Sequence, residues 1–195
     1  MKRVFDICFS LVMLLLLSPV FIVLACCVSL DSRGGIFFGQ WRTGKHEKLF
    51  RLWKFRTMHP HAEHQGQLTV GERDPRITRM GYHLRKYKVD ELPQLWNVLC
   101  GDMSMVGPRP EVPRYTSLYN AEQKRVLSIR PGITDHASLI YFEESRLLAQ
   151  AEDAEKTYIE QVMPAKLKLN LEYLQEMNFA GDLKIIWKTV VRMFS

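Results

Sequence analysis

The hydrophobic pattern of the chain begins with an apolar run over residues 4–30, in which only Asp6 is charged. A straight helix of this length would reach about 40 Å, enough to cross a hydrocarbon core of about 30 Å. Ser18 and Pro19 interrupt the run in its middle. Because a proline inside a helix removes a hydrogen bond and bends the axis, we predict a helix kinked at Ser18-Pro19 rather than a simple transmembrane anchor.

Beyond this run the pattern alternates between short strands and helices. Apolar and aromatic residues beside glycines predict a β-hairpin within residues 31–58, and a polar loop follows over residues 59–73. The fold class is therefore α+β: a small, mostly helical domain with a short hairpin over residues 34–195, preceded by the kinked helix over residues 1–33. Helical patterns cover residues 78–87, the apolar run after Pro93, residues 111–130, residues 143–178 with an interruption near Pro164, and the amphipathic segment 182–194.

Charges on both sides of the apolar run bear on how it meets a membrane. Lys2 and Arg3 precede it, and basic residues recur from Arg33 to Arg56 after it. Such flanks favour the cytoplasm for both ends. Because the stretch from Asp6 to Ser18 reaches only about 18 Å as a helix, half a bilayer, we predict a re-entrant helix that enters one leaflet and returns. A transmembrane anchor, a signal peptide and a lipoprotein signal ending at Cys26 are the alternatives.

Composition limits the partners. The chain has 195 residues, of which 47% are hydrophobic and 25% charged, as expected for one domain with a membrane segment. A net charge of +6 suits a nucleic acid, an anionic membrane or a phosphorylated substrate. No common nucleic-acid-binding motif is visible, so we expect no nucleic acid partner. The four cysteines show no zinc or disulfide spacing and are predicted to be reduced.

A pair of carboxylates, Asp90 and Glu91, stands just before Pro93 and an apolar run. Proline suits the first turn of a helix, so Asp90 or Glu91 is predicted to cap that helix, where free N–H groups favour an ionised carboxylate. An ionised aspartate can attack phosphorus, and a carboxylate pair can hold Mg²⁺ together with substrate phosphates. Capping by Asp90 and solvation of Glu91 would explain the pair without catalysis.

Basic residues surround this pair and could bind a phosphorylated substrate. Arg109 lies between Pro108 and Pro110 and is the strongest candidate, because a guanidinium binds phosphate oxygens in a forked geometry. Some of the cations on the predicted helix 78–87 are expected to bind diphosphate rather than only face solvent. The cations that flank the pair are Arg76, Arg79, Arg85, Lys86, Lys88, Arg109 and Arg114.

Several motifs in order closely resemble the bacterial sugar transferases, which are monotopic phosphoglycosyl transferases, also called polyprenyl-phosphate sugar-1-phosphate transferases. The resemblance covers residues 1 to about 135, and the chain is similar to the minimal single-domain form. The family has a re-entrant helix broken at Ser-Pro and an active site on the cytoplasmic face of the bacterial inner membrane. The motifs are Asp74-Pro75-Arg76-Ile77-Thr78-Arg79-Met80-Gly81, Asp90-Glu91-Leu92-Pro93-Gln94-Leu95, Asn97-Val98-Leu99 and Gly101-Asp102-Met103-Ser104-Met105-Val106-Gly107-Pro108-Arg109-Pro110.

The resemblance implies a reaction in two steps. Asp90 would attack the sugar-bearing phosphate of a UDP-sugar bound with Mg²⁺, and UMP would leave. A polyprenyl phosphate, undecaprenyl phosphate in a bacterium, would then attack this intermediate and give the first membrane-linked intermediate of a surface glycan. Glu91 would assist metal binding or deprotonate the lipid phosphate. The motif Lys54-Phe55-Arg56-Thr57-Met58 adds Lys54 and Arg56 as expected phosphate contacts, beside Arg76, Arg79, Arg85 and Arg109.

Several alternatives stay open from the sequence. Many family members have glycine after Pro-Gly-Ile-Thr where this chain has Asp135, which leaves the sugar unspecified. Segment 182–194 could lie on the membrane or dock on the domain, and a homodimer is compatible with the pattern. His59, His61 and His64 fit no common metal motif, so we expect the loop 59–73 to cover substrate. A non-catalytic membrane adaptor and a glycosyltransferase that releases UDP are the rival functions.

Overall fold

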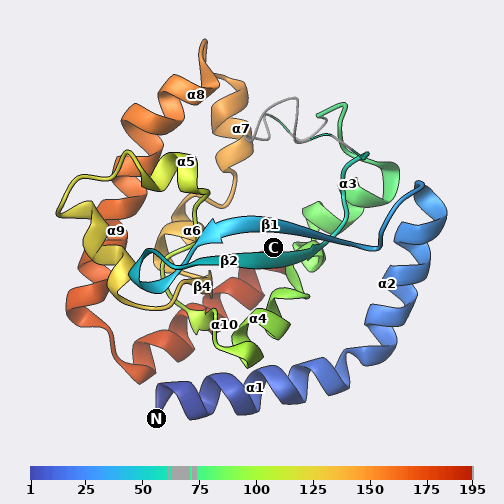
Figure 1. Ribbon diagram of the computed structural model, residues 1–195, viewed down its shortest axis with the longest axis horizontal. Helices are drawn as coiled ribbons and strands as arrows, with labels where there is room; N and C mark the ends of the chain where they lie inside the picture. Colours follow the sequence, from blue (N-terminus) through green and yellow to red (C-terminus); the bar gives the residue numbers. More distant parts are fainter. Residues whose placement is uncertain (61, 63–70, 72–73, 195) are drawn as a thin grey trace.

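The computed structural model describes residues 1–60, 62, 71 and 74–194. The predicted substrate-covering loop, with His61 and His64, falls largely outside the described residues. Figure 1 shows α1 along the bottom of the molecule, α2 at its side, and a hairpin crossing the middle of the view. The elements are α1 (Lys2–Leu16), α2 (Ser18–Asp31), β1 (Phe37–Thr43), η1 (Lys45–Glu47), β2 (Leu49–Phe55), α3 (Arg79–Lys86), η3 (Val89–Glu91), α4 (Gln94–Cys100), β3 (Ser104–Val106), α5 (Pro113–Thr116), η4 (Gln123–Ser128), β4 (Gly132–Thr134), α6 (His136–Ile140), α7 (Glu144–Ala149), α8 (Ala154–Thr157), the π-helical turn η5 (Tyr158–Val162), α9 (Met163–Glu176) and α10 (Phe179–Phe194).

The N-terminal run is a bent helix pair, α1 and α2, with an angle of 62° between the two. The break falls at Leu17, where the hydroxyl of Ser18 donates to the carbonyl of Leu15 across 2.8 Å. Pro19 lies in the first turn of α2, where a backbone N–H has no partner within the helix, so proline is tolerated there. The predicted kink is confirmed. Neither helix alone has the length and apolarity to cross a membrane, and the bent pair meets that criterion only by length and composition.

Helix α1 packs on the domain along its length through Phe5, Phe9, Met13 and Leu14, and its first two turns add polar contacts. The guanidinium of Arg3 donates to the carbonyls of Val98 (2.6 Å) and Leu99 (3.0 Å) at the end of α4. The buried carboxylate of Asp6 accepts hydrogen bonds from the Ser104 hydroxyl (2.8 Å) and the Met105 N–H (3.1 Å) of β3. The only charged side chain of the apolar run is therefore hydrogen-bonded, which offsets the cost of burying a carboxylate.

Strands β1 and β2 form the predicted hairpin, in antiparallel register from Phe37 opposite Phe55 to Thr43 opposite Leu49. The inner side chains of the hairpin enter the core. The side-chain amide of Asn97 on α4 forms two hydrogen bonds with the backbone of β2. Asn97 accepts from the Trp53 N–H at 3.0 Å and donates to the Arg51 carbonyl at 2.8 Å. These bonds tie the hairpin to α4, and β2 also contacts η3.

Helix α3 confirms the prediction for residues 78–87, and the hydroxyl of Thr78 caps it by accepting the Gly81 N–H at 3.0 Å. The chain then reverses at Lys88, whose φ is 54°, and the carboxylate pair falls on the 3₁₀ turn η3. Pro93 occupies the N-cap position of α4, without any side-chain cap. The prediction that Asp90 or Glu91 caps this helix is therefore wrong, because η3 separates the pair from the helix start.

A small parallel sheet brings two motifs together. Strand β3 pairs with β4 through Ser104 opposite Gly132 and Val106 opposite Thr134. A Cβ on Gly132 would lie 2.1 Å from the backbone nitrogen of Gly107, so only glycine allows this approach. Because the strands are parallel, the segments that follow them leave the sheet at the same edge. Arg109 and Asp135 therefore become neighbours.

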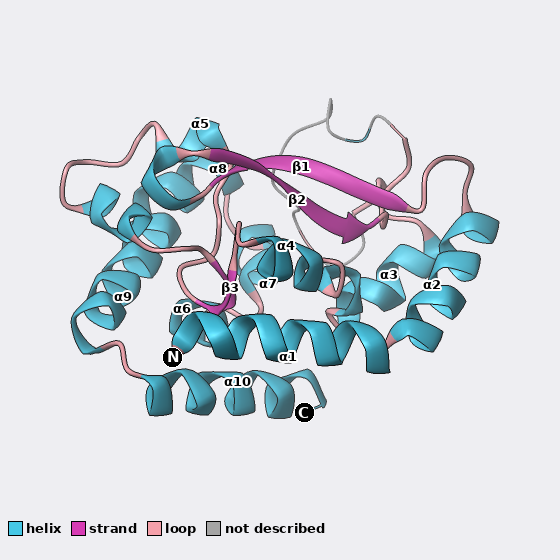
Figure 2. Cartoon of the chain, turned by 60° about the horizontal axis from the view of Figure 1, so that its bottom comes forward, coloured by secondary structure: helices cyan, strands magenta, loops and turns pink. Residues whose placement is uncertain are grey.

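The C-terminal half is helical, as predicted, but more broken. Segment 111–130 forms only the short α5 and η4, and segment 143–178 breaks between α7 and α8 as well as at η5, just before Pro164. Figure 2 shows α10 running beside α1. The rings of Phe5 and Phe179 meet edge to face at 5.2 Å, and Lys2 pairs with the buried Asp182.

Helix α10 docks by one face and exposes another. Ile185 and Ile186 pack against the core, and the Thr189 hydroxyl is hydrogen-bonded to that of Thr134. Trp187 is 68% exposed, and Phe179, Leu183, Val190 and Val191 of the same helix are also exposed. Docking on the domain thus leaves a second apolar face of α10 uncovered.

Candidate active site

The carboxylate pair on η3 meets cations from two other elements. The ammonium of Lys54, near the end of β2, donates to Oε1 of Glu91 at 2.8 Å. The guanidinium of Arg109, just after β3, donates to both oxygens of Glu91 in a forked pair, with Nη1 3.1 Å from Oε2. The structure therefore joins Lys54, Glu91 and Arg109, three residues of the predicted site that are far apart in the sequence.

These contacts set the charge state of Glu91. Burial by itself would raise the pKa of Glu91, but Arg109 and Lys54 outweigh that effect and hold the pKa well below its usual range. Burial lowers the pKa of Lys54, while Glu91 opposes this change. The charge of Glu91 raises the pKa of Arg109. Glu91 is thus an ionised carboxylate whose oxygens are already occupied by cations.

Asp90 lies in a different environment from its neighbour. Its side chain is buried, with 5% of the residue exposed, and its Oδ1 has no hydrogen-bond partner. Burial raises the pKa of Asp90, while Lys54, Arg85 and Lys88 act to lower it. A buried carboxylate oxygen without a partner is costly, and such groups are commonly found where a ligand or a reacting atom completes the site.

The donor set can be tested against a Mg²⁺ ion. Among the described residues, no three His, Cys, Asp or Glu side chains gather as metal ligands. Mg²⁺ at phosphate-transfer sites is commonly held by one or two carboxylates plus substrate phosphates, so no such cluster is required. The carboxylate of Asp90 fits this role better than that of Glu91, because both oxygens of Glu91 are engaged by Lys54 and Arg109. The residues fit an ion held mainly by Asp90 and the substrate.

Three of the other predicted arginines differ in how they are placed relative to the carboxylate pair. Arg85 donates from Nε to the Thr57 hydroxyl at 2.9 Å, and its charge acts on both Asp90 and Glu91. Arg76 forms an ion pair with Asp74 at 2.6 Å. Arg79 is exposed and lines a shallow groove beside α3. Arg85 therefore belongs to the electrostatic surroundings of the pair, whereas Arg76 is paired with Asp74 and Arg79 lies at the groove beside α3.

Arg56 has a different position from the one expected. Its guanidinium is buried and donates to the carbonyls of Ser32 (2.7 Å), Val28 (3.3 Å) and Arg33 at the end of α2. A basic side chain commonly satisfies the free carbonyls at a helix C-terminus in this way. The structure thus brings Lys54 to the carboxylate pair but directs Arg56 to the N-terminal helix pair.

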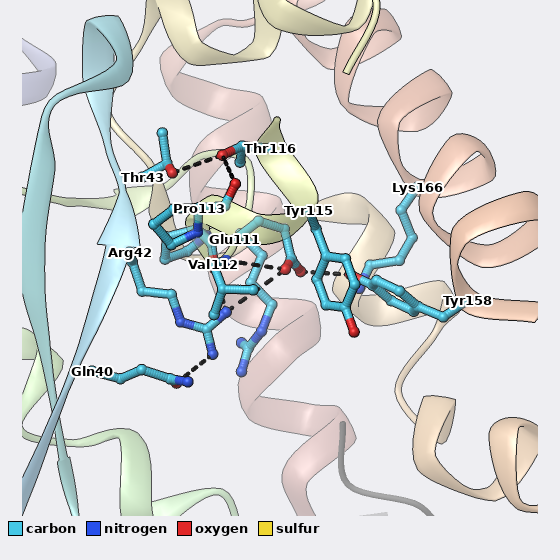
Figure 3. A network of polar contacts seen from close by, with 12 residues as sticks. Gln40, Arg42, Thr43, Glu111, Val112, Pro113, Tyr115, Thr116, Tyr158 and Lys166 are labelled. Carbon is cyan, nitrogen blue, oxygen red and sulfur yellow. Dashed lines mark hydrogen bonds and ion pairs between the residues drawn. The ribbon is translucent and has the colours of Figure 1, made fainter. Parts of the chain in front are cut away.

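A polar network around Glu111, two residues after Arg109, was not predicted from the sequence (Figure 3). Arg42 of β1 donates to the Pro110 carbonyl at 3.2 Å and lies 3.7 Å from the carboxylate of Glu111. The Tyr158 hydroxyl of η5 donates to the same carboxylate at 2.6 Å. Burial lowers the pKa of Arg42 and raises that of Tyr158. These residues fix the backbone that follows Arg109. Only the basic character of Arg42 was visible in the sequence.

Asp135 is the second unpredicted support of Arg109. It is fully buried, and its Oδ2 accepts the backbone N–H of Arg109 at 3.1 Å. Its Oδ1 caps α6 by accepting the Ser138 N–H at 2.5 Å. The residue that departs from the common glycine of the family pattern is therefore part of the support beneath Arg109.

The sequence of the chain is similar to those of several known proteins. The chain is 35% identical over 198 residues to the undecaprenyl-phosphate glucose phosphotransferase of Komagataeibacter xylinus, covering 98% of this chain and 35% of that protein. It is 34% identical over 197 residues to the UDP-glucose:undecaprenyl-phosphate glucose-1-phosphate transferase of Escherichia coli (strain K12), covering 100% of this chain and 40% of that protein.

A third relative is closer to the chain in length. The uncharacterized sugar transferase EpsL of Bacillus subtilis (strain 168) is 37% identical over 190 residues, covering 97% of this chain and 85% of that protein. The family model described as bacterial sugar transferase matches residues 1–195. The carboxylate pair, its cations and these matches lead to one conclusion: the chain belongs to the bacterial sugar transferase family.

Proposed function

We propose that this protein transfers a sugar 1-phosphate from a UDP-sugar to undecaprenyl phosphate and releases UMP. The observation that carries the proposal is the unpartnered, buried Oδ1 of Asp90 beside a Glu91 already bound by Lys54 and Arg109. The names of the relatives from K. xylinus and E. coli support the same pair of substrates. The product would be the first membrane-linked intermediate of a surface glycan such as an O-antigen, a capsule, an exopolysaccharide or a glycoprotein.

In the first step, Asp90 Oδ1 attacks the phosphorus that carries the sugar. A bond forms between this oxygen and phosphorus, the bond from phosphorus to the bridging oxygen breaks, and UMP leaves with the electron pair. Lys54 and Arg109 would bind the phosphate oxygens and stabilise the charge that develops on them. When bound, Mg²⁺ would neutralise charge on the diphosphate, with Asp90 as its protein ligand.

In the second step, a phosphate oxygen of the lipid attacks the same phosphorus and frees the carboxylate of Asp90. The product is a polyprenyl diphosphate that carries the sugar. Glu91 stays ionised because its pKa is held low by its cations, which makes it better suited to orient Lys54 and Arg109 than to carry a proton. Two separate displacements predict ping-pong kinetics and an isolable phospho-sugar on Asp90.

The proposed site of action is the cytoplasmic face of the bacterial inner membrane, with α1 and α2 as a re-entrant pair. Exposed apolar side chains on both helices and on α10 support contact with lipid. On α1 and α2, the exposed apolar side chains are Val4, Ile7, Leu11, Val12, Leu15, Leu16, Val20, Ile22, Val23 and Leu30.

The test is nucleotide release from UDP-glucose, UDP-galactose and UDP-N-acetylgalactosamine with Mg²⁺, with and without undecaprenyl phosphate. We expect UMP from one donor, turnover only with the lipid, and loss of both in Asp90→Asn. Glu122→Gln, which neutralises an exposed carboxylate on the segment before η4, is the matched control and should retain activity. Release of UDP would identify a glycosyltransferase instead, and lipid binding without nucleotide release would identify an adaptor.

A further inference from the structure

The ring of Phe142 brings two cations from distant parts of the chain together. Phe142 lies in the turn between α6 and α7. The ammonium of Lys88 lies 5.2 Å from the centre of this ring, and the guanidinium carbon of Arg192 also lies 5.2 Å from it. Cation–π contacts of this kind are modest in energy, but they hold two long side chains at one place. The last turn of α10 and the start of η3 therefore share a positively charged surface.

Lys88 links this surface to the proposed nucleophile. It stands two residues before Asp90, at the chain reversal that begins η3, and its φ of 54° is uncommon for a residue with a side chain. Backbone strain of this kind persists where the surrounding structure enforces it, and it is frequent at functional sites. The charge of Lys88 also acts on the buried carboxylate of Asp90. Lys88 is therefore two residues from Asp90 in the chain, while its ammonium lies at Phe142.

Arg192 links the same surface to the apolar side of the molecule. On α10 it follows Trp187, Val190 and Val191, whose side chains are exposed. Helix α10 lies beside α1 (Figure 2), and α1 exposes apolar side chains of its own. An isoprenoid chain resting on these side chains would place its phosphate at the last turn of α10. Lys54 and Arg109 are engaged with Glu91 from the hairpin and β3 side and suit the nucleotide substrate.

We propose that Lys88 and Arg192, gathered at Phe142, bind the phosphate of the polyprenyl acceptor and present it to the phospho-sugar on Asp90. A phosphate monoester carries up to two negative charges, so two cations match it. This inference rests on the proposed function, because it divides the cations of that reaction between its two substrates. Lys54 and Arg109 serve the UDP-sugar, and Lys88 and Arg192 serve the lipid.

The two half-reactions separate these roles. In neutral detergent micelles, where no anionic surface attracts the protein, UMP release is measured with stoichiometric enzyme and no lipid, and then as turnover with undecaprenyl phosphate. For Lys88→Gln with Arg192→Gln, we expect the lipid-free release of UMP to persist and the KM for the UDP-sugar to stay within about twofold. The KM for undecaprenyl phosphate should rise about tenfold or more, since charge-assisted contacts to phosphate are lost.

Two further variants serve as controls. Lys168→Gln removes an exposed cation from α9 and should leave both half-reactions unchanged. Lys88→Arg with Arg192→Lys keeps both charges and should recover most of the affinity for the lipid. Two outcomes would overturn the proposed acceptor site but not the proposed function. One is an unchanged lipid KM in the double glutamine variant, and the other is a rise in the KM for the UDP-sugar as large as that for the lipid. No UMP from the wild type with any donor would overturn the proposed function, and this inference with it.

Discussion

The carboxylate of Asp135 accepts the backbone N–H of Arg109 across 3.1 Å and caps α6 through Ser138 with its other oxygen. The two residues follow β3 and β4, which are parallel neighbours, so the end of one strand supports the end of the other. The guanidinium that binds Glu91 therefore projects from a backbone held on one side by Asp135 and on the other by Arg42 through Pro110.

Asp135→Ala should weaken both stability and substrate binding. The loss of a helix cap and of a buried partner for Arg109 is expected to lower the free energy of unfolding by about 2 kcal/mol. The KM for the UDP-sugar should rise several-fold as Arg109 loses its support. Denaturant titration and nucleotide-release kinetics measure the two effects. Asp153→Ala removes a comparable cap from α8, where Asp153 accepts the Lys156 N–H at 3.0 Å, and should cost stability without changing KM.

Tyr158→Phe should reveal the polar network around Glu111. The hydroxyl that donates to Glu111 is lost, and the free energy of unfolding should fall by about 1–2 kcal/mol because a buried charged acceptor loses a donor. Tyr115 is a matched control, since its ring packs 5.0 Å from that of Tyr158 while its hydroxyl lies 3.5 Å from Glu155, a weak contact. Equal losses for Tyr115→Phe and Tyr158→Phe in thermal unfolding would show that the bond to Glu111 contributes little.

Arg56→Met should destabilise the protein and leave substrate binding nearly unchanged. The carbonyls at the end of α2 lose their donor, which should cost about 2 kcal/mol of unfolding free energy. Lys54→Met, two positions earlier, should instead raise the KM for the UDP-sugar about tenfold, because it removes a cation of the carboxylate pair. A raised KM in Arg56→Met at unchanged stability would return Arg56 to the substrate contacts.

The pH dependence of kcat/KM should report the protonation of the Asp90 carboxylate. Burial raises the pKa of this carboxylate, so it takes up a proton at a higher pH than an ordinary aspartate, whose pKa is about 3.9. Activity is therefore expected to fall, as pH decreases, with a midpoint above that value. Lys88→Gln should move the midpoint further up, since the charge of Lys88 lowers the pKa of Asp90. Lys86→Gln, on α3, is the control. An equal shift of the midpoint in both variants would contradict a specific effect of Lys88 on the pKa of Asp90.

Local rules were sufficient for much of the architecture. Ser18 and Pro19 predicted the break between α1 and α2, and glycine turns between aromatic runs predicted the hairpin. The motifs around Asp90 and Arg109 predicted the family and a candidate site, because they are short segments whose chemistry is visible in their residue types. The predicted cap of α4 was wrong because a 3₁₀ turn and a proline cap compete with carboxylate capping, and the sequence does not show which is formed.

Tertiary structure alone decided which charges meet. Lys54 and Arg56 stand in one motif, yet β2 ends at Phe55, so Lys54 reaches Glu91 while Arg56 reaches the end of α2. The supports of Arg109, namely Arg42, Glu111 and Tyr158, come from segments that only the packed fold brings together. The sequence by itself determined the kinds of element and the chemical groups of the site, because these depend on neighbouring residues. The pairing of those groups depends on strand register and helix packing, which are properties of the whole chain.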